Sequence, residues 1–167
     1  GLGDVYKRQM VKALNSNDRD FNVGAAGTTM RFLTAFLSKV VGEWTITGTE
    51  RMKNRPIKVL VDALNALGAR IEYMEKEGYP PLRIFGSALQ GGEISLPGNV
   101  SSQYISAILM IAPLTENGVT LHLEGAIISR PYIHITLQLM EQYGVRASWT
   151  ENTIKVLPQE YKPIRFT

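Results

Sequence analysis

Two segments rich in glycine and hydroxyl side chains each stand directly before a strongly apolar stretch, where they could bind an anion. The first is Gly24-Ala25-Ala26-Gly27-Thr28-Thr29, and the second is Val100-Ser101-Ser102-Gln103. The start of a helix offers unpaired backbone N–H groups and the positive end of the helix dipole, which together favour phosphate or carboxylate. A simpler interpretation is that Thr28 and Ser101 are only N-caps, and it is favoured for either segment taken alone. Because the first segment lacks the Lys-Ser/Thr ending of a P-loop, no nucleotide site is expected.

Arginines accompany both segments. Arg31 lies one turn into the first apolar stretch, where an unpaired charge is costly, so it needs an acidic partner or a bound anion. Arg51 and Arg55 fall in a loop before a further helical pattern, and the equivalent loop farther along holds Ser129, Arg130 and Tyr132. A structural ion pair is an equally good explanation for each arginine. Two helix starts and two such loops, if they converge, would form a pocket for more than one anion.

Other kinds of chemistry are not expected. His134 has no second ligand at metal spacing on its face, so no metal site is predicted. The chain contains no cysteine, which excludes a disulfide, a thiolate zinc site or a cysteine nucleophile within it. Its 18 Lys and Arg stand against 15 Asp and Glu without a run of like charge, which argues against a nucleic-acid partner.

No membrane partner is expected either. The longest mostly apolar stretch, from Tyr104 to Leu114, is far shorter than the ~20 residues of a membrane span. Because the first ten residues lack the apolar core of a secretory signal, the cytoplasm is the expected compartment.

The residues between about 21 and 158 repeat one pattern twice. Arg55-Pro56-Ile57 and Arg130-Pro131-Tyr132, 75 positions apart, each begin an amphipathic helical pattern. Each is preceded by an alternating strand, Trp44 to Gly48 or Val119 to Gly125, and followed by two strand-like pieces. The repeating unit is therefore strand, helix, strand, helix, strand, strand, with units at about 21–86 and 92–158.

The helices before these strands, at 28–41 and 101–114, are apolar around most of their circumference, which is typical of buried helices. The predicted fold is therefore α/β (α+β), with buried helices surrounded by sheets and all helix starts at one end. Residues 1–9 are interpreted as a scar of cloning or sequence assembly rather than part of the fold. Because Lys162 to Thr167 read as an interrupted strand, we expect a fragment, with residues 10–167 forming part of a lobe.

The motifs together resemble the 5-enolpyruvylshikimate-3-phosphate synthase family (3-phosphoshikimate 1-carboxyvinyltransferase). The matching motifs, in family order, are Ala26-Gly27-Thr28-Thr29-Met30-Arg31, Arg51-Met52-Lys53-Asn54-Arg55-Pro56-Ile57, Ser101-Ser102-Gln103-Tyr104 and Ser129-Arg130-Pro131-Tyr132-Ile133. The resemblance covers residues 21–167, and implies a lobe of strand-helix units within a two-lobed, monomeric parent. It departs from the family at Ala25, where Asn is usual, and at Arg130, where lysine is common.

The resemblance implies transfer of the carboxyvinyl group of phosphoenolpyruvate to the 5-hydroxyl of shikimate 3-phosphate, with release of phosphate and without a metal or organic cofactor. It places Gly27, Arg51 and Gln103 at phosphoenolpyruvate. The implied shikimate 3-phosphate residues are Ser101, Ser102, Gln103, Ser129 and Tyr132, and the implied supporting residues are Thr28, Arg31, Arg55 and Arg130. The acid/base residues are expected in the missing lobe, so the chain alone should be inactive.

Two alternatives remain open. One is an enzyme like UDP-N-acetylglucosamine enolpyruvyl transferase, whose reactive cysteine could lie in the missing lobe. The Ser-Ser-Gln and Arg-Met-Lys-Asn-Arg-Pro motifs favour the shikimate enzyme instead. The other is a non-catalytic anion-binding module of the same fold. An uncovered lobe face would expose apolar surface and promote association.

Overall fold

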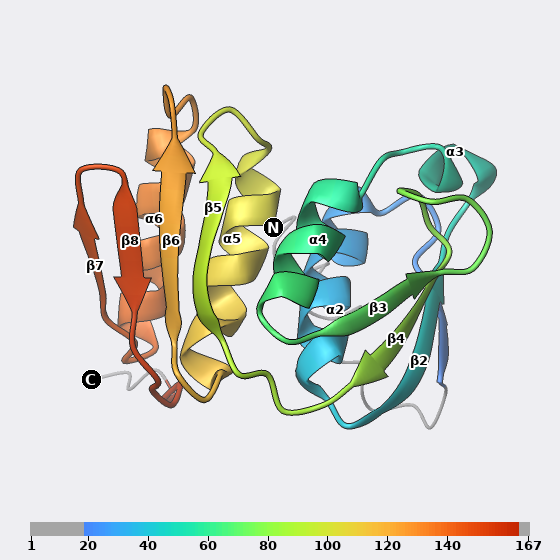
Figure 1. Ribbon diagram of the computed structural model, residues 1–167, viewed down its shortest axis with the longest axis horizontal. Helices are drawn as coiled ribbons and strands as arrows, with labels where there is room; N and C mark the ends of the chain where they lie inside the picture. The colour runs from blue at the N-terminus through green and yellow to red at the C-terminus, as the bar shows by residue number, and fades with distance from the viewer. Residues whose placement is uncertain (1–18, 164–167) are drawn as a thin grey trace.

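The computed structural model describes residues 19–163, which form two consecutive copies of one unit (Figure 1). The first copy contains β1 (Asp20–Asn22), α2 (Gly27–Lys39), β2 (Gly42–Thr47), α3 (Glu50–Lys53), α4 (Lys58–Ala66), β3 (Arg70–Tyr73) and β4 (Leu82–Gly86). The second contains β5 (Gly92–Pro97), α5 (Ser102–Ile111), a 3₁₀ turn (Ala112–Leu114), β6 (Val119–Glu124), α6 (Arg130–Gln142), β7 (Ala147–Thr150) and β8 (Thr153–Val156). The predicted order of strands and helices is confirmed, apart from the short helix α3.

Each unit folds its four strands into a separate sheet with the same topology. The strand orders are β1-β2-β4-β3 and β5-β6-β8-β7, in which the first two strands are parallel and the other pairs antiparallel. A parallel pair needs a crossover that carries the chain back, and α2 and α5 supply it. As a consequence, the long helices all begin at the end of the molecule where the parallel strands finish, which is uppermost in Figure 1.

The two predicted apolar helices are the inner ones. α2 and α5 pack against each other between the two sheets, and both present mostly buried residues (Figure 1). One continuous apolar cluster includes Leu33 and Leu37 of α2 together with Ile105 and Ile108 of α5. Helices buried on most sides need apolar residues on most sides, which is the pattern in the sequence. The inside-helix architecture is therefore confirmed.

The Arg-Pro motifs begin their helices differently in the two units. α6 starts at Arg130 with Pro131 in its first turn, where proline loses no hydrogen bond. α4 starts only at Lys58, so Arg55 lies in a turn between α3 and α4 rather than on the helix. Arg51, predicted in a loop, lies on α3, whose start is capped by the Thr49 hydroxyl accepting from the Met52 N–H at 3.3 Å.

A short connection joins the two units firmly. Leu89 in this connection is buried, and its carbonyl accepts a hydrogen bond from the Glu116 N–H at 2.9 Å. Gly91 adopts a left-handed conformation (φ +79°), and a Cβ there would lie 2.2 Å from the Gly118 carbonyl oxygen. Only glycine satisfies both conditions, so this residue allows the linker to lie against the second unit.

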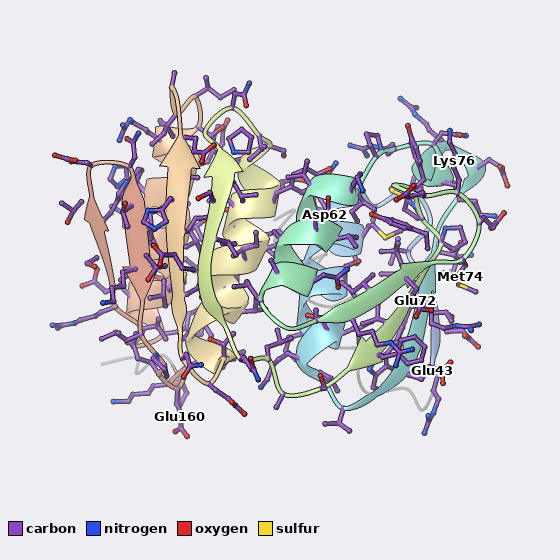
Figure 2. All side chains as sticks on the ribbon, viewed as in Figure 1. Glu43, Asp62, Glu72, Met74, Lys76 and Glu160 are labelled. Carbon is purple, nitrogen blue, oxygen red and sulfur yellow. The ribbon has the colours of Figure 1, made fainter. Side chains whose placement is uncertain are left out.

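The outer faces of the sheets carry polar side chains. Glu43 on β2 pairs with Arg83 on β4 at 3.6 Å, and Figure 2 shows Glu43 and Glu72 on the outside of the first sheet. No helix within residues 19–163 is long and apolar enough to cross a membrane. The proposed scar at residues 1–9 lies outside the described residues, as does most of the predicted terminal strand; Lys162 and Pro163, which are described, have no regular structure.

Candidate anion-binding site

Backbone hydrogen bonds bring the loops that precede the helices together within each unit. In the first unit the Thr49 N–H donates to the Gly24 carbonyl at 3.0 Å, which joins the loop before α2 to the loop before α3. In the second unit the Ile128 N–H donates to the Gly98 carbonyl at 3.3 Å, which joins the loops before α5 and α6. The segments predicted to hold an anion thus lie at the same end of the fold.

The starts of α2 and α5 are joined directly by one side chain. Gln103 accepts a hydrogen bond from Arg31 Nη1 through its Oε1 and donates from its Nε2 to Thr28 Oγ1 at 3.0 Å. Both polar atoms of the amide therefore have partners on the neighbouring unit. Because oxygen and nitrogen have different partners, the amide can lie in only one orientation. The two sequence motifs, 75 residues apart, meet at this contact.

Tyr104 connects the same arginine to a third segment. The Arg31 Cζ lies 5.2 Å from the centroid of the Tyr104 ring, within the range of a cation–π contact. The Tyr104 hydroxyl donates to the Pro56 carbonyl at 2.7 Å, in the turn between α3 and α4. The sequence analysis left Tyr104 out of the predicted site. The signal was its polar end in an apolar helix, because a buried tyrosine hydroxyl usually has a partner.

Arg31 and Arg55 lie near each other beside Gly27. Both line a cavity of about 10 Å³, which is closed by Gly27, Met30, Met52, Pro56, Ile57 and Pro80. A Cβ on Gly27 would lie 2.6 Å from Arg55 Nη1, so glycine is what admits this guanidinium to the first turn of α2. Positive charge is therefore concentrated at the helix start, where the dipole adds to it.

The expected acidic partners of these arginines are not found. Within residues 19–163, no ion pair joins Arg31, Arg51 or Arg55 to a carboxylate. Arg31 is instead held by an amide and an aromatic ring, which leave its charge uncompensated. Between the two explanations offered by the sequence, this arrangement favours a bound anion.

The two predicted N-caps differ. Ser101 is the N-cap of α5, where its hydroxyl accepts from the Gln103 N–H at 3.3 Å. Thr28 is not a cap: the N-cap of α2 is Ala26, and it makes no side-chain hydrogen bond. The helix begins at Gly27, so Thr28 falls inside the first turn and its hydroxyl accepts from Gln103 instead. The capping interpretation of Thr28 was therefore wrong.

The loop before α6 supplies hydroxyl groups at the same end. Ser129 is the N-cap residue of α6 but makes no capping hydrogen bond through its side chain, and Tyr132 is exposed. Arg130 lies elsewhere, with its Cζ 5.5 Å from the centroid of the Trp149 ring on the edge strand β7. That Arg51 and Ser129 share one depression with Gln103 stays a prediction.

A larger hollow, about 400 Å³ in volume, lies between α6 and β7, away from Gln103. Its lining consists of His134, Leu137, Gln138, Glu141, Arg146 and Ala147. Glu141 and Arg146 offer opposite charges, and it has no helix start. Within the described residues no group of three or more His, Cys, Asp or Glu side chains could hold a metal ion. The cluster of arginines around Gln103 is therefore the stronger candidate for phosphate binding.

Comparisons with known proteins agree with the motifs. A family model described as EPSP synthase (3-phosphoshikimate 1-carboxyvinyltransferase) matches residues 3–166. A Bacteroides fragilis 3-phosphoshikimate 1-carboxyvinyltransferase is 58% identical over 159 residues, which are 95% of this chain and 39% of the relative. The corresponding protein of Shewanella oneidensis is 46% identical over 146 residues, covering 87% of this chain and 33% of its own length.

A solved structure has the same fold. It is an EPSP synthase from Acinetobacter baumannii, which superposes with a TM-score of 0.75 at 24% sequence identity and covers 89% of this chain and 32% of its own. The chain thus spans 39% or less of the length of these relatives. Since the family model matches almost all of it, the chain belongs to the EPSP synthase (3-phosphoshikimate 1-carboxyvinyltransferase) family.

Proposed function

We propose that this chain forms the part of a 3-phosphoshikimate 1-carboxyvinyltransferase that holds phosphoenolpyruvate and shikimate 3-phosphate. The enzyme would transfer the carboxyvinyl group of phosphoenolpyruvate to the 5-hydroxyl of shikimate 3-phosphate and release phosphate. The observation that carries the proposal is the contact of Gln103 with Arg31 and Thr28, which joins the helix starts of the two units. It lies beside guanidinium groups that have no carboxylate partner within residues 19–163.

The first unit would bind phosphoenolpyruvate. Gly27 offers a backbone N–H in the first turn of α2, and Arg51 on α3 offers a guanidinium. A phosphate and a carboxylate on one small molecule require several such donors, and charge-assisted hydrogen bonds are the strong ones. Gln103, whose amide is oriented by Arg31 and Thr28, would meet both substrates from the second unit.

The second unit would bind shikimate 3-phosphate. Ser101, Ser102 and Ser129 lie at the starts of α5 and α6 and supply hydroxyl donors to the phosphate. Tyr132, one turn into α6, would lie against the ring of the substrate together with Gln103. The helix dipoles of α5 and α6 favour the phosphate at this place.

Binding and turnover should separate in this chain. The reaction needs a group that protonates the methylene of phosphoenolpyruvate and a group that removes the proton of the 5-hydroxyl. We assign both groups to the part of the relatives that this chain does not span. A site open to water also stabilises developing charge less than a closed one does. The chain should therefore bind shikimate 3-phosphate weakly and not convert it.

Isothermal titration calorimetry tests the binding. The purified chain is titrated with shikimate 3-phosphate, and with inorganic phosphate and shikimate as controls. We expect tighter binding of shikimate 3-phosphate than of either control, and loss of the difference in Ser102→Ala. The matched control is Ser148→Ala, on the edge strand β7. Equal binding of inorganic phosphate and shikimate 3-phosphate would mean a simple anion-binding module and would contradict the proposal.

Phosphate release tests the division of labour. The chain is mixed with phosphoenolpyruvate and shikimate 3-phosphate, and phosphate is followed with time. We expect no release above the rate without protein. Turnover that disappears in Arg51→Ala but persists in Arg70→Ala would show a complete active site in this chain. Arg70 is a suitable control because it pairs with Glu72 on the outer face of the first sheet.

A further inference from the structure

Helix α6 carries an apolar stripe that nothing covers. Ile128, Tyr132, Ile135 and Leu139 are exposed by 68, 63, 59 and 43%, and their spacing of four, three and four residues puts them along one line of the helix. Another line of the same helix is buried, including Ile133 and Met140. An amphipathic surface helix normally exposes polar side chains on the face that points away from the core. The stripe is therefore a second apolar face.

The internal repeat shows what this second face is for. The residues 75 positions earlier than Tyr132, Ile135 and Leu139 are Ile57, Leu60 and Leu64. In the first unit these counterparts are only 2, 0 and 0% exposed. The difference arises because α4 is followed by a second unit, whose first helix α5 packs against it, whereas no further unit follows α6 within the described residues. The stripe thus matches the start of another unit.

The complementary surface lies at the other end of the same chain. α5 is buried on most sides because α2, α4 and α6 all pack on it. α2 is the first helix of the first unit, and within residues 19–163 no second helix of a preceding unit lies against it. Phe32 and Phe36 on α2 are accordingly only half-buried, whereas their counterparts in α5, Ala107 and Ile111, are buried.

We propose that a second copy of this chain docks head to tail, with the α2 face around Phe32 and Phe36 of one copy seated on the α6 stripe of the other. The contact would reproduce between copies the packing of α5 on α4 within one copy. Each chain carries both halves of the interface, so the occupant requires no other partner. Because the two halves are different surfaces, the interface is heterologous and leaves a free half at each end of a dimer.

The chemistry of the stripe favours a protein surface as its occupant. Its four side chains are uncharged, and Pro131, Gln138 and Gln142 beside it are uncharged as well. Loss of charged residues from the centre of a patch is typical of protein interfaces. A nucleic acid or an anionic membrane would call for lysines and arginines here instead.

The mass of the chain in solution tests the proposal. Sedimentation velocity over a dilution series should show a mass that rises with concentration beyond the dimer. Leu139→Glu, which blocks the stripe, and Phe36→Glu, which blocks the α2 face, should each give monomers. An equimolar mixture of these two variants should give a dimer and nothing larger, because one intact stripe meets one intact α2 face. Gln138→Glu, exposed on the same helix, should associate like the unmodified chain.

The absence of cysteine allows a second test that needs only mild substitutions. Chains with Phe36→Cys and Ile135→Cys are mixed and treated with a short bismaleimide. We expect cross-linked dimers in the mixture, fewer from either variant alone, and none when Glu141→Cys replaces Ile135→Cys. Circular dichroism checks that each variant is folded.

Three results would overturn the proposal. A monomer at every concentration would mean that the stripe belongs to a further unit of a longer polypeptide. Cross-linking of Ile135→Cys to itself, with association unaffected by Phe36→Glu, would mean that two stripes pair with each other. Association that survives both glutamate substitutions would place the interface elsewhere.

Discussion

Arg31 and Gln103 are hydrogen-bonded to each other although 72 residues separate them, and this bond joins the first helix of one unit to the first helix of the next. The arginine is half-buried and also lies against the Tyr104 ring. It therefore does two things: it orients the Gln103 amide, and it places a positive charge between two helix starts. Both contributions favour an anionic substrate.

Replacement of Arg31 should weaken substrate binding more than folding. In Arg31→Met the side chain keeps much of its apolar stem, but the amide of Gln103 loses its donor and the site loses a charge. We expect the affinity for phosphoenolpyruvate to fall about tenfold or more, the loss of one charge-assisted hydrogen bond. Titration calorimetry measures it, with Arg70→Met as the control on the outer sheet face. An unchanged affinity would remove Arg31 from the site.

A methyl group on Gly27 should displace Arg55. The added Cβ would lie 2.6 Å from Arg55 Nη1, the far end of a flexible side chain, so the guanidinium can move without unfolding the protein. We expect Gly27→Ala to keep its unfolding midpoint and to bind phosphoenolpyruvate several-fold more weakly. In an Arg55→Ala background the same substitution should have little further effect, since residues in contact are not additive. Equal effects in both backgrounds would show that the methyl group acts on the ligand directly.

The neighbouring serines should separate stability from binding. Ser101 caps α5 through the Gln103 N–H, whereas Ser102 is the first residue of the helix. Ser101→Ala should therefore lower the free energy of unfolding by about 1 kcal/mol, the usual loss of an N-cap. Ser102→Ala should leave it within ±0.5 kcal/mol or so, as for surface substitutions. Urea unfolding measures both, and calorimetry with shikimate 3-phosphate should show weaker binding in each. A larger loss of stability in Ser102→Ala would contradict the assigned cap.

Tyr161 should make the protein less stable at alkaline pH. Burial raises its pKa from 10.0 to about 12, while its hydroxyl donates to the Met110 carbonyl at 2.5 Å. Between these values the unfolded chain releases the phenolic proton before the folded chain does. The contribution of the neutral tyrosine is therefore complete below pH 10 and is lost as the pH rises toward 12. Urea unfolding at about pH 9 and about pH 11 should show a smaller alkaline loss in Tyr161→Phe. The control is Tyr143→Phe, and an equal loss in both would contradict the assignment.

The sequence alone determined the architecture of the units, because that depends on periodicities along the chain. The all-round apolarity from Met30 to Val41 and from Tyr104 to Leu114 predicted the inner helices, and the Arg-Pro motifs 75 residues apart predicted the repeat. These patterns are local, so every residue needed to detect them lies within a few turns or strands. The helix starts were also within reach, since glycine and serine before an apolar run mark them.

Only the tertiary structure decided which side chains meet. The contacts of Arg31 with Gln103 and Tyr104, and of Tyr104 with Pro56, cross from one unit to the other. They depend on how α2, α4 and α5 pack, which periodicity does not specify. The same reason explains why Thr28 was misassigned as a cap: its hydroxyl had a better partner in Gln103, 75 residues away. It also explains the stripe on α6, whose residues match buried ones in α4 by position and differ from them only in having no neighbouring unit.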